Sequence, residues 1–309
     1  MVISPTRGLL PAPLLPMARS ALAGSAGRTL LAECPCALLE FFGTPEACVL
    51  RLVCRELQAA VAAHPWEDME AVIRGSIGAW RACFPRARRA NVRMLTSDRN
   101  AAVRRIPVVD ADFVHFEGLW ELDMSFCKAV TDAAFVHLRG IRVLNMWACK
   151  QAATDAAFAH LVGIQKLCIS SCNQATLTDA AFIHLRGIRM LNMNCCRQLT
   201  DAAFAHLGGI HTLIMFGCHQ PAITDAAFAH LRGIHSLVME GCHQGSITGA
   251  GLAHLAGIAN LGMWACSEEA IAAAEELGLP VTKFQLEYGG FDCSFEDPGY
   301  NFDEDAEEQ

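Results

Sequence analysis

The sequence is poor in charge and lacks a long uninterrupted apolar segment. Of its 309 residues only 18% are charged, against 53% that are hydrophobic, so the chain can bury a large core. The formal net charge of −8 argues against bulk nucleic-acid binding. The apolar run at residues 8–18 is broken by prolines and is too short to span a membrane. We therefore expect no nucleic-acid partner and no membrane partner.

Catalytic motifs are missing as well. The sequence contains no glycine-rich phosphate loop, no Ser or Cys nucleophile signature with a spaced His and acid, and no paired carboxylates within its repeats. We expect a protein that is not an enzyme and that needs no cofactor. A hydrolase whose active site assembles only in space is the competing interpretation.

Cysteine, in contrast, is abundant. The odd total of 15 fits poorly with a fully paired secreted framework, so a reducing compartment, cytoplasmic or nuclear, is expected. Seven of these cysteines recur at one position of a sequence repeat, which predicts an internal column of small buried thiols. They are Cys127, Cys149, Cys172, Cys196, Cys218, Cys242 and Cys266.

One phrase recurs about seven times between Asp110 and Cys266. It reads Thr-Asp-Ala-Ala-Phe-x-His-Leu-x-Gly, followed by Ile-x-x-Leu-x-Met-x-x-Cys. The glycines that close its first half give a period of 22 to 24 residues, which is typical of a solenoid. They are Gly118, Gly140, Gly163, Gly187, Gly209, Gly233 and Gly257.

The first half of the phrase predicts a short helix. In residues 131–138, Thr131 is a natural N-cap and Asp132 complements the positive helix start. Phe135 and Leu138 fall on one apolar stripe with a preceding alanine. Gly140 supplies the backbone freedom needed to leave the helix.

The second half of the phrase predicts a short strand. Leu144 and Met146 are two residues apart, so they lie on one face, whereas Asn145 and Trp147 face the other way. A single unit buries too little apolar area to offset the entropy of ordering its backbone. The units must therefore stack into a curved array.

The repeated Leu-x-x-Leu-x-Leu-x-x-Cys pattern, with Met at the third position in most units and Thr-Asp after it, resembles the cysteine-containing leucine-rich repeats. The resemblance covers residues 110–266. It implies an α/β solenoid, a horseshoe with a parallel sheet on its concave side and helices outside. The units are short, which leaves the helix length and the curvature open.

A second resemblance precedes the array. The residues Pro45-Glu46 and Leu50-Arg51-Leu52-Val53-Cys54-Arg55, with Trp66 at the end, are similar to an F-box, a small all-α domain. Leu30-Leu31 stands where that family has Leu-Pro, and Pro35 falls inside its first helix. The alternative is a generic helical cap on the first repeat.

The two resemblances together imply a substrate-recognition subunit of an SCF-type cullin–RING ubiquitin ligase. The F-box would dock a Skp-type adaptor, and through it a cullin, while the repeats bind a target protein. The alternative is a non-catalytic interaction scaffold with no ligase link. The residues that would be divided between the domain's own core and the adaptor groove are Leu38, Leu39, Phe42, Val49, Leu52 and Val53.

Strand positions facing away from the core predict the target-binding surface on the concave side of the sheet. Exposed aromatic side chains on a rigid sheet are plausible binding anchors, although they could instead pack on each other or under the C-terminal segment. The candidates are Trp147, Asn192, Asn194, Ile214, Phe216, Val238, Glu240 and Trp264.

Histidine also recurs once per repeat, at a helix position that needs only a structural role. Cys218-His219 and Cys242-His243 could bring two thiols and two imidazoles together, as zinc would require. Because the cysteines should face inward, we expect no metal site.

The remaining segments complete the predicted organisation. The leader lacks acids and is expected to be disordered, with organelle targeting or secretion as alternatives. Between Arg74 and Arg105 nine arginines face one acid, which predicts a solvated edge or a docking patch for an acidic segment. The acidic tail is expected to be disordered or to fold back. The predicted parts are a leader 1–28, an F-box-like domain 29–66, a basic linker and degenerate capping repeat 67–109, leucine-rich repeats with a C-terminal cap 110–286, and the acidic tail 287–309.

Overall fold

A computed structural model describes residues 39, 43, 47–48, 50–52, 55–66, 73, 76–92, 107–149 and 153–282. The chain divides into two compact units, Met1–Met94 and Leu95–Gln309, and the division lies inside the predicted linker 67–109. The predicted leader 1–28 and acidic tail 287–309 lie outside the described residues, as do Leu38, Phe42, Val49 and Val53.

In the described part of the N-terminal unit, two helices and a strand have defined bounds. They are α5 (Arg55–Ala63), α6 (Ile77–Cys83) and β1 (Arg89–Asn91). Trp66 is 2% exposed, its indole Nε1 donates to the Val61 carbonyl at 2.8 Å, and its ring meets the Phe84 ring edge-on at 5.9 Å between centroids. Ser76 caps α6 by accepting a hydrogen bond from the Ala79 amide. A buried Trp whose N–H is satisfied therefore anchors this small core.

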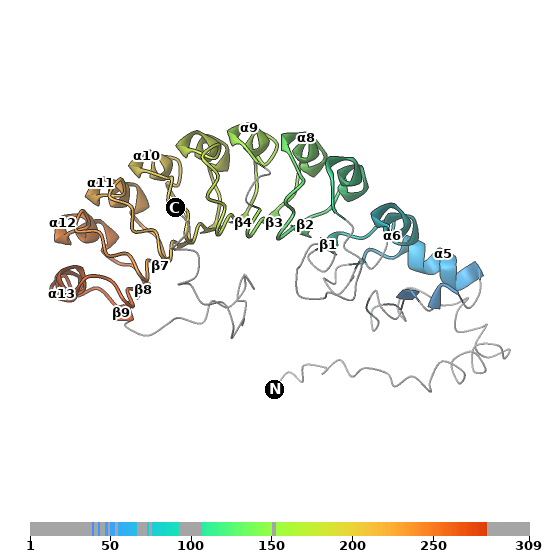
Figure 1. Cartoon of the computed structure of the whole chain (residues 1–309). Helices are drawn as coiled ribbons and strands as arrows, with labels where there is room; N and C mark the ends of the chain where they lie inside the picture. The colour runs from blue at the N-terminus through green and yellow to red at the C-terminus, as the bar shows by residue number, and fades with distance from the viewer. Residues whose placement is uncertain are drawn as a thin grey trace, which may run out of the picture. The chain divides into compact units, whose positions relative to one another are not determined.

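The C-terminal unit is a repeat array built on one parallel sheet. Neighbouring strands pair in chain order and in register, so that Leu144 lies opposite Leu167 and Leu167 opposite Leu191. In Figure 1 the strands line the inner side of the arc that these repeats form. The strands are β2 (Glu121–Asp123), β3 (Val143–Asn145), β4 (Lys166–Cys168), β5 (Met190–Asn192), β6 (Thr212–Ile214), β7 (Ser236–Val238), β8 (Asn260–Gly262) and β9 (Val281–Thr282).

Short helical turns form the outer layer of the array. Three of them are one α-helical turn that tightens into a 3-10 turn, and the others in the repeats are a single α-helical turn or a short 3-10 helix. They are η1 (Asp110–Phe116), α8 (Asp132–Phe135), η2 (Val136–Leu138), α9 (Asp155–Phe158), η3 (Asp179–Leu185), α10 (Asp201–Phe204), α11 (Asp225–Phe228), η4 (Ala229–Leu231), α12 (Gly249–Leu252), η5 (Ala253–Leu255) and the closing α13 (Glu268–Glu276).

The local predictions for one repeat are confirmed. The Thr131 side chain caps α8 by accepting from the Ala133 amide. Phe135 is 0% exposed and Leu138 is 2% exposed, as the apolar stripe requires. Gly140 has φ +84°, a conformation open to glycine at no steric cost.

The core lies between the sheet and the helical turns and repeats its composition in each unit. Leu144 and Met146 point into it from the strand, and both are 0% exposed. Leu replaces the repeated Phe in the last unit at Leu252. The repeated Phe side chains, all 0% exposed, are Phe113, Phe135, Phe158, Phe182, Phe204 and Phe228. This is a leucine-rich-repeat solenoid, as the sequence predicts.

Candidate protein-binding surfaces

A strained turn ends each strand and aims the next residue inward. The residue directly before the repeated Cys has a left-handed backbone in every repeat, and in two repeats it is glycine, Gly217 and Gly241. A Cβ at Gly217 would lie 3.3 Å from the Cys195 sulfur. At the other repeats the position is non-glycine, at Phe126, Ala148, Ser171, Cys195 and Ala265. These two glycines are the only signal of the turn in the sequence.

The repeated cysteines form a buried column, as predicted, and the structure adds a hydrogen bond to each thiol beyond the first. The Cys149 sulfur donates to the Met124 carbonyl of the preceding repeat at 3.1 Å, and the Cys218 sulfur donates to the Met193 carbonyl at 3.1 Å. The cysteines among the described residues are free thiols. The thiols therefore link neighbouring repeats through weak S–H donors.

Burial keeps these thiols protonated. It raises the pKa of Cys172 and of Cys218 from 9.0 to about 12. It also raises the pKa of Cys196 well above its ordinary value, with the neighbouring Cys218 and Cys172 thiols adding to the effect of burial. The thiolate is the nucleophile and the metal ligand, so this column is suited to packing rather than to chemistry.

Aspartates at the helix starts connect the outer layer from one repeat to the next. The Asp179 carboxylate accepts from the Thr200 amide at 2.8 Å and from the Thr200 hydroxyl at 2.6 Å. Asp132 makes the same pair of contacts with Thr154. The sequence suggested only a helix-dipole role for Asp132, because the partner lies one repeat away in the chain. The motif ends where Gly249 replaces the repeated Asp.

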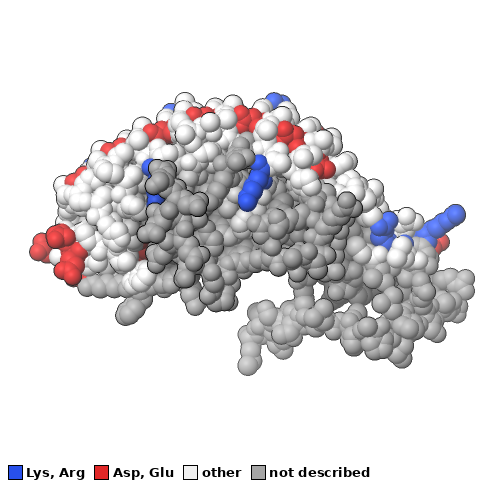
Figure 2. Space-filling view, viewed as in Figure 1, with Lys and Arg blue, Asp and Glu red and all other residues white. Residues whose placement is uncertain are grey.

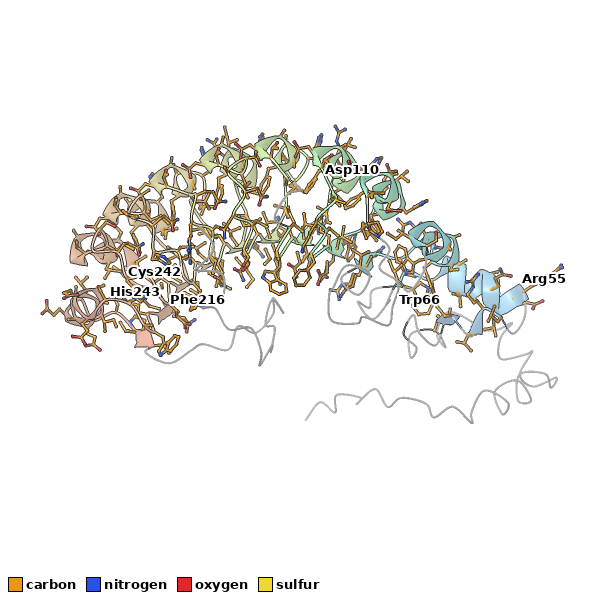
Figure 3. All side chains as sticks on the ribbon, in the orientation of Figure 1. Arg55, Trp66, Asp110, Phe216, Cys242 and His243 are labelled. Carbon is orange, nitrogen blue, oxygen red and sulfur yellow. The ribbon has the colours of Figure 1, made fainter. Side chains whose placement is uncertain are left out.

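The strand register brings the predicted target-binding residues onto neighbouring strands. Asn192 pairs with Ile214, and Ile214 with Val238. The Asn194 side chain accepts from the Phe216 amide at 2.8 Å, and the Asn194 amide donates to the Asn192 side chain at 3.0 Å. Figure 3 shows Phe216 on the strand side of the arc and Asp110 in the helical layer.

Four of the predicted target-binding residues are buried. Asn192 is 3% exposed, Ile214 1%, Val238 2% and Glu240 1%, so these four side chains offer little area to a partner in this structure. Asn192, Ile214 and Val238 lie on strands that have a neighbouring strand about 4.8 Å away on each side, which removes part of their surface from solvent. A sequence pattern assigns the face of a strand but not the depth of a side chain on it.

The predicted aromatic residues keep more accessible surface. Trp264 is 45% exposed, whereas Trp147, Phe216 and Asn194 are half-buried. The Trp147 ring meets Phe126 edge-on with 4.4 Å between centroids. Trp264, Phe216 and Trp147 are therefore the accessible candidates for target binding, and their binding role stays a prediction.

Two of the predicted adaptor-binding residues can be placed, and they differ in exposure. Leu39 is 0% exposed, whereas Leu52 is 71% exposed. A fully buried leucine contributes to the core of its own unit. A leucine with most of its surface in water is available to a partner. The predicted division between core and groove is consistent with these two positions, although docking itself remains a prediction.

The candidate zinc residues are not arranged as a site. The His219 and His243 rings have centroids 6.4 Å apart, and Cys218 and Cys242 beside them in sequence are buried at 0% and 2% exposure. Figure 3 labels Cys242 and His243. Within residues 107–149 and 153–282 and the described part of the N-terminal unit, no group of three or more His, Cys, Asp or Glu is placed to hold a metal ion.

The repeated histidines make isolated polar contacts. His137 Nδ1 lies 2.7 Å from the Glu117 carboxylate, and His254 Nδ1 lies 3.1 Å from the Arg232 guanidinium. In the part of the chain that the structure describes, no helix has both the length and the apolar character needed to cross a membrane.

Comparisons with known proteins bear on the fold alone. No family model matches the chain, and no curated protein does. Solved structures with a similar arrangement include the TLR13–ssRNA13 complex (14% identity, TM-score 0.45, 62% of this chain and 27% of that one) and human 5T4, trophoblast glycoprotein (17% identity, TM-score 0.45, 62% of this chain and 75% of that one). The yeast Rad7 and Elc1 complex is a third (18% identity, TM-score 0.37, 46% of this chain and 41% of that one). The chain thus spans well under half of the TLR13 and Rad7–Elc1 matches, and its own repeat geometry defines its class.

Proposed function

We propose that this protein is the substrate-recognition subunit of an SCF-type cullin–RING ubiquitin ligase. The segment 29–66 docks a Skp-type adaptor, and the concave face of the array holds a target protein. The protein performs no bond chemistry. It raises the concentration of its target beside the ubiquitin-loading machinery.

The observation that carries the adaptor half of the proposal is the contrast between Leu39 and Leu52. In the F-box resemblance both belong to the set divided between core and groove. Leu52, at 71% exposed, is the most exposed large apolar side chain among the described residues of either unit. Exposing a leucine to that extent in the middle of an apolar segment is consistent with a docking role.

The target half is supported by the rigid sheet and by its accessible rings. Trp264 is 45% exposed on the last complete repeat, and Phe216 is half-buried two strands away. Aromatic side chains held on a fixed backbone bind with little loss of conformational freedom, so they suit binding hot spots.

Co-purification with a Skp-type adaptor tests the proposal. We expect the wild-type chain to retain the adaptor and the double variant Leu52→Asp, Val53→Asp to lose it. Val162→Asp is a matched control, because Val162 is 64% exposed but lies in the array. Circular dichroism must show that the array stays folded in each variant. Retained adaptor in the double variant, or no adaptor with the wild type, would favour a scaffold without a ligase link.

A further inference from the structure

Basic side chains gather along one edge of the array, where each helical turn ends and the next strand begins. Five arginines there are exposed, and the single lysine is half-buried. We call these residues the basic rim. They are Arg139, Arg142, Lys166, Arg186, Arg189 and Arg232.

Backbone hydrogen bonds relate Arg142 and Arg189 through Gln165 of the repeat between them. The Gln165 amide donates to the Arg142 carbonyl at 2.8 Å, and the Arg189 amide donates to the Gln165 carbonyl at 3.0 Å. Arg142 and Arg189 therefore stand two strands apart, about 10 Å at the usual strand spacing. Arg139 and Arg186 precede them by three residues in the same repeats, so a second basic row runs beside the first.

The charge of the rim is not neutralised by the described residues. Arg139 Nε lies 3.5 Å from His160 Nδ1, and the Arg142 guanidinium lies 5.8 Å from the centre of the Trp120 ring. None of the six rim cations is paired with a carboxylate in the part of the chain that the structure describes. The rim is therefore a surface of uncompensated positive charge.

Acidic side chains are held elsewhere on the array. The repeated aspartates begin the helical turns, at the opposite end of each turn from the rim, and accept hydrogen bonds from threonines of the next repeat. Figure 2 shows Asp and Glu following the helical layer along the arc. Two further acids, Glu117 and Glu121, lie in the first repeat, at one end of the array, and Glu117 contacts His137. Separating the two signs of charge in this way favours an anionic ligand along the rim.

We propose that the basic rim binds an acidic peptide segment, and that its occupant is the chain's own segment 287–309. That segment contains nine acids and no Lys or Arg. It follows closely after β9, the last strand of the same array. Four or five extended residues at about 3.3 Å each span about 15 Å. This is longer than a three-residue strand, so the chain after β9 can return to the edge of the sheet where the strands begin and where the rim lies.

Because the segment 287–309 is covalently attached to the array, it is favoured over a separate polyanion as the occupant of the rim. A tethered segment is present at an effective concentration in the millimolar range, whereas a free partner must compete at its cellular concentration. Single-stranded nucleic acid binds through open ring faces, but the imidazoles of His211 and His235, which hold the same repeat position as Arg189, stack on each other at 4.5 Å between centroids. The docked segment occupies the rim until a more acidic partner displaces it. This inference does not depend on the adaptor assignment.

A competition experiment on the full chain tests the proposal. The probe is a fluorescent peptide that copies residues 287–309, followed by anisotropy. It is added to the native chain and to a neutral-tail chain, in which the nine acids of that segment are replaced by Asn and Gln. The neutral-tail chain should bind the probe about tenfold more tightly, since its rim is vacant. Binding should weaken strongly between about 50 and about 300 mM NaCl.

Rim variants in the neutral-tail chain complete the test. Arg139→Ala, Arg186→Ala and Arg232→Ala together should weaken probe binding about tenfold or more. The control pair Lys128→Ala and Arg197→Ala, exposed cations beyond the strand ends, should leave it unchanged. Equal probe affinity for the native and neutral-tail chains would overturn the proposal, as would full binding by the triple variant. A single-stranded oligonucleotide that outcompetes the peptide would also overturn it and would assign the rim to nucleic acid.

Discussion

The repeat array and the N-terminal unit use apolar residues in different ways. In the array, the same core positions are buried in each repeat, and the backbone hydrogen bonds between strands recur about one period later. In the described part of the N-terminal unit, Trp66 and Phe84 pack together in a small core, and Leu52 is exposed to solvent. The repeated sequence thus allows the fold of the array to be predicted, whereas the fold of the N-terminal unit depends on individual contacts that do not recur.

The largest difference between the two regions should appear at alkaline pH. Folding raises the pKa of the array thiols, for example of Cys266 from 9.0 to about 11 and of Cys172 from 9.0 to about 12. Above about pH 9 the unfolded chain loses protons that the folded chain retains, so their contribution to stability is present below pH 9 and is lost as pH rises toward 11 or 12. Ionisation of each such thiol in the unfolded chain lowers the free energy of unfolding by up to about 1.4 kcal/mol per pH unit in that window.

Urea unfolding followed by circular dichroism at about pH 8 and about pH 10 measures this effect. Because several thiols titrate together, the loss should exceed that of most single substitutions. In Cys172→Ala, the unfolding free energy should depend less on pH, by about the contribution of one titrating thiol. An unfolding free energy that is equal at the two pH values would contradict the buried column.

Removing one repeated ring should produce the largest effect of a single side chain. Phe182→Ala leaves a cavity at a fully buried site, and we expect a loss of about 3 to 5 kcal/mol in unfolding free energy. Ile183→Ala is the matched control, because Ile183 is 48% exposed and should change stability by less than about 0.5 kcal/mol. Similar losses for the two variants would mean that the core is not where the structure places it.

The sequence predicted accurately those features of the array that depend on the residues of a single repeat. The helix caps and the apolar stripe were correct because each depends on neighbours a few residues away, and the internal thiols were correct because they recur at one position of the repeat. The contact between Asp179 and Thr200 was missed because it joins two repeats. The burial of Ile214 and Glu240 was not predicted, because alternation along a strand fixes the direction of a side chain and not its accessible area. For the N-terminal unit, the adaptor-binding role of Leu52 rests on resemblance and exposure alone.

A departure from the repeat consensus offers a smaller test. Gly251 stands where most repeats have Ala, such as Ala203 and Ala227, so a consensus argument predicts that Gly251→Ala stabilises the protein. In the structure the added Cβ would lie 2.9 Å from the Asp225 Cα atom, so backbone must move. We expect a loss of about 1 to 3 kcal/mol by thermal or urea unfolding.

Gly208→Ala is the control for that substitution. A Cβ at Gly208 meets nothing within 4 Å, so this variant should be neutral or slightly stabilising. If Gly251→Ala proved as harmless as Gly208→Ala, the close approach of α12 to α11 would be wrong.

The smallest expected effect concerns the link between outer turns. Asp179→Asn keeps the shape of the side chain but removes the charge that accepts from the Thr200 amide and hydroxyl. We expect a loss of about 1 to 2 kcal/mol, since hydrogen bonds to charged groups exceed neutral ones. Adding Thr200→Val should then cost less than it does in the wild-type chain, and strictly additive losses in this double-mutant cycle would argue against the contact.

Thiol accessibility tests the internal stacking of the repeats most directly. The native protein is treated with N-ethylmaleimide, and each cysteine is assigned by peptide mass spectrometry with a urea-unfolded sample as reference. The seven repeated cysteines should stay unmodified in the native protein, while Cys48, which is exposed, reacts. Reaction of Cys149, Cys172 or Cys196 at the rate of Cys48, or their recovery as disulfides, would contradict the stacked array on which the proposed receptor depends.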